Sequence, residues 1–390
     1  MAHNDIFSSA FCHPLDPKSS HRYSWELASL TGSPKRRFPG SQPVSCRRQR
    51  LIRLDPDEYV AFEKTDGVRS LVFFPSDHCA AKETMPRLLL INRQNRHYAL
   101  TCWPATSSGQ LLSTTACRGT VLDGELVFLE RRSGGKQLSF LVFDCLAVRG
   151  QRMTTQPFAN RHAMVENLMK SLEVVQFPMA PTGSEHKKLE LSVKRAWPCQ
   201  DLGYLLGSVI PQLGHQNDGL VITHKRAPYI FGTTDLSIKW KKSSDLTVDF
   251  RLRCLERRGG LHGKRSCKGL ESPAQFGLFI FTGDRPDEFY APLTLHASET
   301  MTASLCRSRL NGKIVECYRD LAGRWRLHLD MAGLPRVRED KKNGNHCKVV
   351  EDIVGAMEDG ISESELLDIL HNSQQKQSRP VLMGSHLVCS

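Results

Sequence analysis

The sequence predicts an α+β domain followed by a smaller β-barrel domain, and two patterns carry that prediction. Residues 39–245 contain short apolar or alternating runs separated by Gly, Asp and Pro, with helical spacing in one segment. Such a mixture favours strands and helices packed together. Residues 246–345 contain further alternating runs without a helical period, which favours a small barrel. A chain of 390 residues has room for about two to three domains.

The first domain is predicted to hold at least one helix among several strands. The helix follows Asn160, a suitable N-cap, and repeats apolar residues at helical spacing from Met164 to Leu172. The short apolar or alternating runs are predicted strands, at Tyr59–Lys64, Ser70–Phe74, Arg87–Ile91, Thr120–Phe128, Ser139–Val148 and Leu220–Thr223.

The second domain begins with a strand predicted to be half-buried, because apolar residues 248, 250, 252 and 254 alternate with polar Asp249, Arg251 and Arg253. Four or five strands within about 90 residues suggest an OB-fold. The further strands are predicted at Phe276–Phe281, Lys313–Tyr318 and Arg324–Leu329. Residues 346–372 return to helical spacing and are predicted to form one or two C-terminal helices.

Both ends of the chain are predicted to lack fixed structure. Residues 1–38 are polar, basic and aperiodic, which is typical of a flexible arm, and residues 373–390 are predicted to be a disordered tail. The formal net charge is +12, and residues 1–53 carry nine Lys and Arg against three acidic residues. This excess favours a polyanionic partner.

Several classes of protein are disfavoured by composition. No apolar stretch approaches the roughly 18 residues that a bilayer requires, and no signal peptide is apparent at the N-terminus. The 13 cysteines are odd in number and contain no CxxC pair. Neither a zinc ribbon nor a disulfide framework is therefore predicted, and the thiols are expected in a reducing compartment.

Lys64 is the first candidate catalytic residue. It closes a predicted apolar strand, and Asp66-Gly67 forms a turn that leads directly into the next strand. A lysine nucleophile must lose its proton before it attacks, and partial burial or neighbouring cations favour the neutral amine. By itself this pattern is more typical of a hairpin with an exposed lysine.

Further charged residues of the kinds that bind phosphates and metal ions follow Lys64 along the chain. Carboxylates within a strand are costly unless they face a cation or sugar hydroxyls, and two lysines on one face of a strand can straddle a phosphate. Together they form a consistent site for a nucleoside triphosphate and its metal ion. The residues are Asp123 and Glu125 within a strand, Asp218 at a strand start, Lys239 and Lys241 two positions apart, and the cluster 338–341.

These motifs resemble those of the GTP:RNA guanylyltransferases, the mRNA capping enzymes of the covalent nucleotidyltransferase superfamily. The matching strings, in the family's order, are EKTDGVR (63–69), LDGELVF (122–128), FLVFDCLAVRG (140–150), DGLVIT (218–223), IKWKKSSDLTVDF (238–250) and RVREDKKNGNH (336–346). The resemblance covers about residues 38–372. It implies a nucleotidyltransferase domain at 39–245, with ATP-grasp-like antiparallel sheets and helices, and an OB-fold domain at 246–345.

The resemblance also implies a role for each matching residue. Lys64 would attack the α-phosphate of GTP and form lysyl-GMP, and the GMP would pass to the 5′-diphosphate end of RNA. The other implied roles are Arg69 and Glu125 at the ribose, Arg93 as a nucleotide contact, Phe143 against guanine, Asp218 and Glu125 at a Mg²⁺ or Mn²⁺ ion, Lys239 and Lys241 at the α-phosphate, and Arg338, Asp340 and Lys341 at the β- and γ-phosphates.

The partners implied are GTP, 5′-diphosphate RNA, a separate RNA triphosphatase and cap methyltransferase, and the phosphorylated C-terminal tail of RNA polymerase II. A nuclear location and no membrane contact are expected. An ATP-dependent polynucleotide ligase is the nearest alternative, but a ligase would usually carry Glu at Asp218 and lacks the cluster 338–341. A catalytically inactive RNA-binding relative is the other, although it would not need all of these charged residues.

Overall fold

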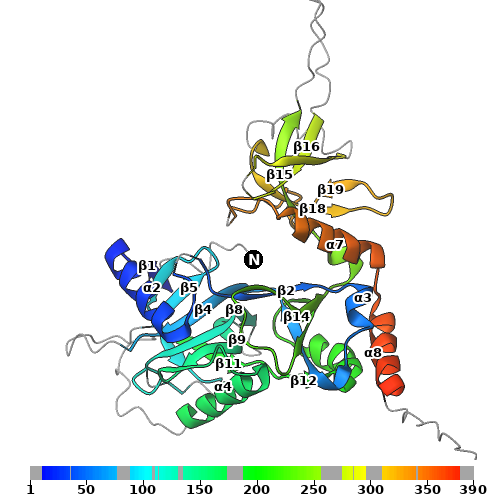
Figure 1. The fold of residues 1–390 in the computed structure, drawn as a ribbon. Helices are drawn as coiled ribbons and strands as arrows, with labels where there is room; N and C mark the ends of the chain where they lie inside the picture. The colour runs from blue at the N-terminus through cyan, green and yellow to red at the C-terminus, as the bar shows by residue number, and fades with distance from the viewer. Residues whose placement is uncertain are drawn as a thin grey trace, which may run out of the picture. The chain divides into compact units, whose positions relative to one another are not determined.

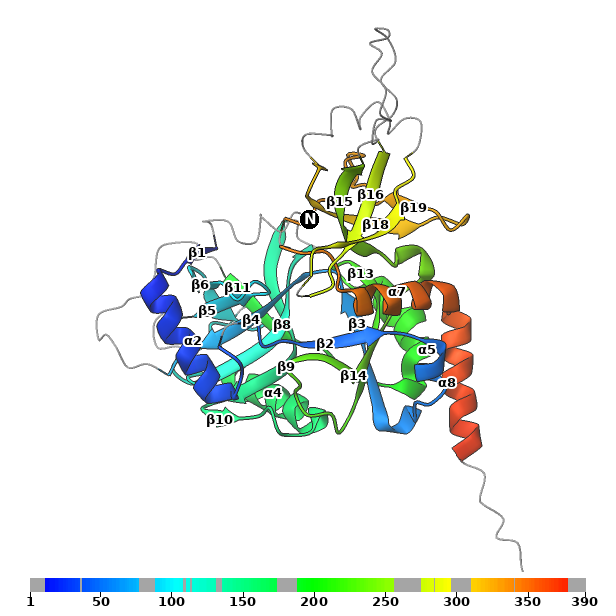
Figure 2. The same cartoon turned by 45° about the horizontal axis from the view of Figure 1, so that its top comes forward.

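The computed structural model divides into two compact units, Met1–Lys241 with Ser362–Ser390, and Lys242–Ile361. Figures 1 and 2 show the elements of each as ribbons. The chain therefore leaves the first unit, forms the second, and returns to the first. The structure describes residues 11–35, 37–76, 88–107, 110–112, 114–130, 135–173, 188–255, 275–283, 285–295, 310–339 and 341–377.

A nine-stranded sheet dominates the first unit, in the order β1-β6-β5-β4-β8-β9-β11-β7, with β10 paired to β9. Its described pairs are antiparallel except those of β11 with β9 and β7. The strands are β1 (Cys12–Pro14), β4 (Val68–Phe74), β5 (Leu89–Asn92), β6 (His97–Leu100), β7 (Trp103–Ala105), β8 (Thr120–Glu130), β9 (Lys136–Val148), β10 (Gln151–Arg152) and β11 (Lys188–Val193).

Helices cover both faces of this sheet. Helix α4 (Phe158–Glu173) contributes Val165 and Leu168 to the core on one face, and helix α2 (Pro17–Thr31) contributes Tyr23 and Leu27 to the core on the other. Central strands buried on both faces read as near-continuous apolar runs rather than alternating ones. The helix predicted to follow Asn160 is confirmed, but it begins at Phe158, so Asn160 lies within its first turn and is not its N-cap.

The flexible arm predicted for residues 1–38 is corrected by β1 and α2. Asp16 caps α2 by accepting hydrogen bonds from the backbone N–H groups of Lys18 and Ser19, and Pro17 occupies the first turn, where its missing N–H is not needed. The ring of Tyr23 packs edge-on against Phe73, with centroids 6.4 Å apart. Burial against the sheet thus stabilises a segment whose composition is polar.

A second sheet of the first unit has the order β12-β3-β13-β14-β2. Only the pair of β14 with β2 is parallel among its described pairs. The strands are β2 (Ser41–Ser45), β3 (Tyr59–Thr65), β12 (Trp197–Pro198), β13 (Asn217–His224) and β14 (Gly232–Trp240). The first unit also contains short helical segments, of which η1 and η2 contact β3. They are α3 (Arg48–Leu51), η1 (Pro56–Glu58), η2 (Cys199–Asp201), α5 (Leu202–Tyr204), η3 (Leu205–Val209) and η4 (Ile210–Gln212).

Within the described residues, the second unit consists of a five-stranded antiparallel sheet, one α-helix and one short 3-10 helix. The strand order is β17-β16-β15-β18-β19, and the predicted alternation of β15 is confirmed because Val248, Phe250 and Leu252 lie in the core. The Phe250 ring stands edge-on to Trp325, with centroids 4.9 Å apart. The elements are η5 (Ser243–Asp245), β15 (Val248–Leu255), β16 (Gln275–Ile280), β17 (Glu288–Pro292), β18 (Ile314–Arg319), β19 (Trp325–Leu327) and α7 (Cys347–Asp359). This arrangement agrees with the predicted OB-fold.

The two C-terminal helices belong to different units. Helix α7 buries Val350 and Ile353 in the core of the second unit, so that unit extends beyond the predicted boundary at residue 345. Helix α8 (Glu363–Gln377) packs on η1 and η2 of the first unit and buries Leu366 and Leu370. It continues into the tail predicted at 373–390, of which residues 378–390 lie outside the described part.

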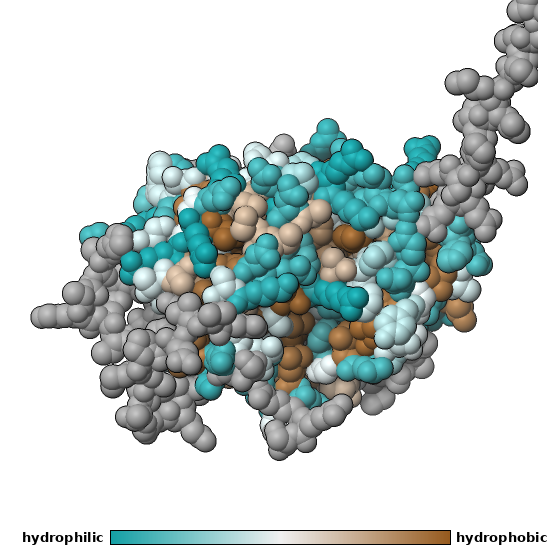
Figure 3. Space-filling model, turned by 90° about the horizontal axis from the view of Figure 1, so that it is seen from below, coloured by the Kyte–Doolittle hydropathy of each residue, from teal (hydrophilic) through white to brown (hydrophobic). Residues whose placement is uncertain are grey.

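The surface combines polar and apolar side chains. On the face shown in Figure 3, hydrophilic and hydrophobic residues are interspersed. Within the described residues, no helix is both long and apolar enough to cross a membrane. The nine cysteines of the described chain are all free, and seven of them are buried.

Candidate active site

Lys64 lies near the end of β3 and is hydrogen-bonded to a carboxylate of the neighbouring strand. Its Nζ atom donates to Oδ1 of Asp218 on β13 at 2.6 Å. The other carboxylate oxygen of Asp218 pairs with Nζ of Lys241, which directly follows β14. All three side chains are about one-fifth exposed. One carboxylate therefore joins two lysines at the surface of the second sheet.

A backbone irregularity places Asp218 between the lysines. The register of β13 against β3 shifts between Asn217 and Leu220. Gly219 adopts a φ of 141°, and a Cβ atom there would overlap the carbonyl oxygen of Trp240. Only glycine suits such a conformation and such a close approach. The glycine of the Asp218-Gly219 pair thus fixes where the carboxylate lies.

Lys239 lies on β14 opposite Val221 of β13, and its backbone carbonyl accepts a hydrogen bond from Cys46. Because strand residues two apart share a face, Lys239 and Lys241 occupy neighbouring positions on one side of the sheet. The side chain of Lys239 is half-buried. The predicted pair of lysines is thus brought to the same region as Lys64.

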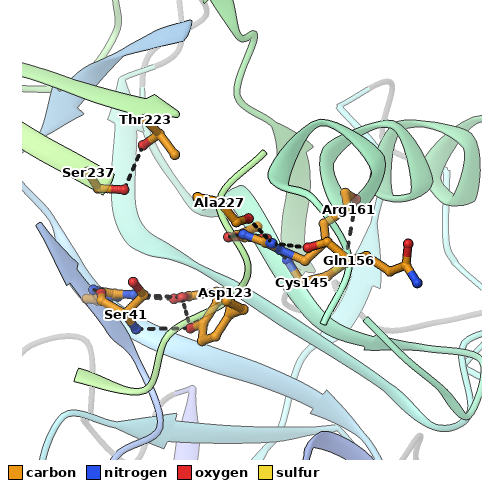
Figure 4. A network of polar contacts seen from close by, with 11 residues as sticks. Ser41, Asp123, Cys145, Gln156, Arg161, Thr223, Ala227 and Ser237 are labelled. Carbon is orange, nitrogen blue, oxygen red and sulfur yellow. Dashed lines mark hydrogen bonds and ion pairs between the residues drawn. The ribbon is translucent and has the colours of Figure 1, made fainter. Parts of the chain in front are cut away.

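Arg69 is held rigidly on β4 of the large sheet. Its guanidinium donates to both carboxylate oxygens of Asp123 on β8, at 3.1 and 2.7 Å, and to the carbonyl oxygen of Ser41. The Tyr229 hydroxyl donates to the same carboxylate. Figure 4 shows the adjacent positions of Ser41 and Asp123. The Asp123 side chain is fully buried, so this is a desolvated, bidentate ion pair.

Phe143 and Phe38 flank the Arg69 guanidinium. Its Cζ atom lies 5.2 Å from the Phe143 ring centroid and 5.8 Å from that of Phe38. Both rings are half-buried. The residue predicted to stack on guanine therefore lies beside the residue predicted to hold the ribose.

Glu125 lies opposite Arg69 across the β4–β8 pair. Its Oε2 atom is buried and has no hydrogen-bond partner within the described chain. Burial raises the pKa of the Glu125 carboxyl, and the nearby positive charges of Lys194, Lys64 and Arg69 act against that rise. A buried acceptor without a partner is costly, and it marks a position where a ligand can supply the missing contact.

The two carboxylates predicted at a metal ion, Glu125 and Asp218, are close enough to influence each other electrostatically. No group of three or more His, Cys, Asp or Glu side chains suited to a metal occurs among the described residues. Mg²⁺ is nevertheless often held by one or two carboxylates together with substrate phosphates. The unsatisfied oxygen of Glu125 and the accessible carboxylate of Asp218 fit that requirement.

Lys194 directly follows β11 and was not predicted from the sequence to belong to the site. Its Nζ atom donates to the backbone oxygen of Glu63 at 2.6 Å and to Oγ1 of Thr65 at 2.8 Å, and it pairs with the Glu63 carboxylate at 3.1 Å. It is buried. A buried lysine thus supports the strand that carries Lys64, and no local sequence signal marks it.

Arg93 lies in the exposed turn between β5 and β6. The turn emerges beside Arg69 because Asn92, the residue before it, pairs with Ser70 across β4 and β5. Asn92 accepts hydrogen bonds from the backbone N–H groups of Gln94 and Arg96, which shapes the turn. Arg93 is therefore placed near the nucleotide-site candidates but not buried among them.

The remaining candidates belong to the second unit. Arg338 donates to both oxygens of Asp249, at 3.3 and 3.2 Å, and Lys341 pairs with the same carboxylate. The alternation of β15 predicted Asp249 on the polar side of the strand, yet it is only 5% exposed because these two cations cover it. Asp340 lies outside the described residues.

Comparison with known proteins defines the class. The family model described as mRNA capping enzyme, catalytic domain, matches residues 13–243, and that for the C-terminal domain matches residues 246–367. The lysine-bearing first unit and the small β-rich second unit are accordingly those of a nucleotidyltransferase. The chain belongs to the mRNA capping enzyme family, and the resemblance drawn from the sequence is confirmed.

Individual relatives support the same assignment. The chain is 31% identical over 352 residues to mRNA-capping enzyme subunit alpha of Schizosaccharomyces pombe, covering 87% of this chain and 82% of the relative. For the Saccharomyces cerevisiae protein of that name, the identity is 30% over 390 residues, with 88% and 81% covered. The mRNA-capping enzyme of Caenorhabditis elegans is 23% identical, and the match covers 93% of this chain but 53% of the worm protein.

Proposed function

We propose that this protein is an mRNA guanylyltransferase that transfers GMP from GTP, through a covalent lysyl-GMP intermediate, to the 5′-diphosphate end of RNA. The observation that carries the proposal is the Lys64–Asp218–Lys241 arrangement, in which one carboxylate bridges a strand-end lysine and a second cation. In this arrangement Lys64 is the nucleophile, Asp218 accepts its proton, and Lys241 is a positive charge that can bind phosphate. The names of the relatives, mRNA-capping enzymes, agree with it.

In the first step, the Nζ atom of Lys64 bonds to the α-phosphorus of GTP, while the bond from that phosphorus to the oxygen of the leaving pyrophosphate breaks. An ammonium group has no lone pair, so Lys64 must first release a proton. Oδ1 of Asp218, 2.6 Å away, is within reach to accept it. Lys241 and Lys239 then stabilise the charge that builds on the α-phosphate oxygens.

The large sheet supplies the nucleotide-binding residues. Arg69 and Glu125 face each other across the β4–β8 pair and would hold the ribose, and the Phe143 ring would stack on guanine. Arg93 would contact the nucleotide from the exposed β5–β6 turn. Because the Arg69 guanidinium is fixed by Asp123, little conformational entropy is lost when GTP binds.

Glu125 and Asp218 would hold a Mg²⁺ or Mn²⁺ ion together with the nucleotide phosphates. When bound, such an ion neutralises phosphate charge and makes the pyrophosphate a better leaving group. Glu125 is suited to this role because its buried Oε2 atom is without a partner in the described chain. Asp218 keeps an accessible carboxylate that already faces two cations.

Arg338, Asp340 and Lys341 of the second unit would engage the β- and γ-phosphates and orient pyrophosphate for in-line departure. Asp249 forms ion pairs with two of these side chains, those of Arg338 and Lys341, and is a positioning residue in this scheme. In the second step, a terminal β-phosphate oxygen of the RNA bonds to the α-phosphorus, the P–N bond breaks, and Lys64 takes up a proton again.

Separate proteins are proposed to act together with this one in cap formation. The relatives' designation "subunit alpha" indicates assembly with another chain, which agrees with a separate RNA triphosphatase. A separate cap methyltransferase, docking on the phosphorylated C-terminal tail of RNA polymerase II, and a nuclear location complete the proposed context.

Labelling with a nucleotide tests the proposal. The protein is incubated with GTP or ATP radiolabelled at the α-phosphate and a divalent metal, and covalent label is detected after denaturation. Label from GTP that is absent in Lys64→Ala but retained in Lys170→Ala, an exposed lysine of α4, is expected. Label from ATP alone would favour a polynucleotide ligase, and absence of label from both nucleotides would favour an inactive RNA-binding relative.

A further inference from the structure

The exposed side of α2 carries an aromatic ring among basic residues. Trp25 is 53% exposed, whereas the other four tryptophans of the chain are buried, each at 7% or less. Lys18, His21 and Arg22 lie on the same side at helical spacing from Trp25, and all three are exposed. Together with Lys35, which follows the helix, these five residues are called the α2 surface.

The indole ring of Trp25 is oriented without being buried. Its Nε1–H group donates to Nε2 of His21 at 2.9 Å, and the His21 ring stands edge-on to it at 6.2 Å. The ammonium group of Lys35 lies over the indole ring. Two side chains therefore hold an aromatic ring that faces solvent. Exposed aromatic rings in a basic setting are the platforms on which proteins stack the bases of single-stranded nucleic acids.

The charge of the α2 surface is only partly offset by the acidic residues beside it, Asp16 at the helix N-cap and Glu26 within the helix. Glu26 is the sole acidic residue of α2, and its Oε1 atom accepts a hydrogen bond from the backbone N–H of Ser76 at 2.6 Å. The turn between β5 and β6 adds further cations, because Asn95 donates to the carbonyl oxygen of Lys35 at 3.3 Å and stands between Arg93 and Arg96. This charge is complementary to a polyanion.

A short segment connects the α2 surface to the nucleotide site. The Lys35 ammonium contacts Trp25, and three residues later the Phe38 ring lies 5.8 Å from Cζ of Arg69. Three residues of extended chain span at most about 11 Å. The stacking ring is therefore only a few nucleotides from the residue proposed to bind the ribose of GTP.

We propose that the α2 surface binds the acceptor RNA just downstream of its 5′ end. Trp25 stacks one base, and Lys18, Arg22 and Lys35 neutralise the neighbouring phosphates. The indole ring favours RNA over a phosphorylated peptide, because every base offers a π-face for stacking, whereas a phosphopeptide is recognised chiefly through charge-assisted hydrogen bonds. This inference rests on the proposed function for the identity of the RNA end.

Acceptor length tests the inference. GMP transfer is measured with a 5′-diphosphate RNA of about 15 nucleotides, which can extend over a stacking site, and with a 5′-diphosphate dinucleotide. Trp25→Ala is expected to raise the KM for the long RNA about tenfold and to leave the KM for the dinucleotide and the formation of lysyl-GMP unchanged. Tyr204→Ala, which removes another exposed ring from a stretch without basic residues, is the matched control.

Binding without catalysis separates this inference from the proposed function. Because Trp25 is the exposed tryptophan, RNA should quench its fluorescence, and Lys35→Ala should flatten the dependence of log K on log salt by about 0.7, whereas Arg53→Ala should not. These results would support the inference even if no lysyl-GMP forms. Equal effects of Trp25→Ala on both acceptors, no effect on either, or impaired binding of a phosphorylated peptide alone would overturn it.

Discussion

Arg69 and Asp123 form a bidentate ion pair between two central strands, with N···O distances of 3.1 and 2.7 Å. The Asp123 side chain is fully buried, and that of Arg69 is 10% exposed. The residue proposed to hold the ribose is thus also part of the interior of the sheet. Binding and stability depend on the same contact.

Asp123→Asn is expected to lower the free energy of unfolding by about 3 kcal/mol, because it leaves the Arg69 charge buried without its carboxylate. Urea denaturation measures this loss. The double variant Arg69→Met with Asp123→Leu should regain much of the stability but form no lysyl-GMP. If the single variant unfolds like the unmodified protein, the ion pair is not desolvated in the manner described.

Lys241→Ala is expected to slow the formation of lysyl-GMP by about 10²- to 10³-fold, the usual cost of removing one group that stabilises transition-state charge. Single-turnover labelling with GTP measures the rate. Lys242→Ala is the matched control, because it removes the neighbouring exposed lysine. Similar rates for the two variants would contradict the role of the Asp218-bound lysine.

Asp249→Asn is expected to impair the two chemical steps unequally. Arg338 and Lys341 are proposed to act on the departing pyrophosphate, so lysyl-GMP formation should fall about 100-fold. Transfer of GMP from preformed lysyl-GMP to RNA should change far less. Asp287→Asn breaks another carboxylate–arginine contact of the second unit, with Arg251, and serves as the control. An equal loss in both steps would argue for a general structural defect.

The buried ring of His97 is expected to make the free energy of unfolding depend on pH. Burial lowers its pKa to about 4 from an ordinary value of 6.5. The unfolded chain therefore binds a proton on His97 that the folded chain does not bind. Above about pH 6.5 the ring is neutral in both states, and the free energy of unfolding falls as the pH drops from there toward 4. The loss amounts to about 3 kcal/mol over that range.

Urea denaturation between pH 7 and 4 tests this prediction. In His97→Gln, which has no titrating ring beside Ser24 of α2, the unfolding free energy should fall less steeply with decreasing pH. Parallel pH profiles for the two proteins would show that His97 is not the responsible group.

Local patterns in the sequence predicted the central strands and the residues around Lys64, but not the features that depend on distant contacts. The composition of α2 is polar, so the sequence did not predict that one face of this helix is buried. That face is defined by its packing on Phe73 and its neighbours. Asp249 obeys the alternation of its strand, yet it is buried because cations about 90 residues later cover it. Lys194 is buried because Glu63 and Thr65, more than 120 residues earlier, satisfy its ammonium group.

The return of the chain to the first unit through α8 limits how the protein can be divided. A chain ended after Lys241 keeps both sheets and Lys64, but it loses the helix that buries Leu366 and Leu370 and pairs Glu365 with Arg48. A single proteolytic cut between the units would likewise leave them joined by the other crossing. Isolating the lysine-bearing unit intact would require replacing residues 242–361 by a short linker, so that α8 remains attached.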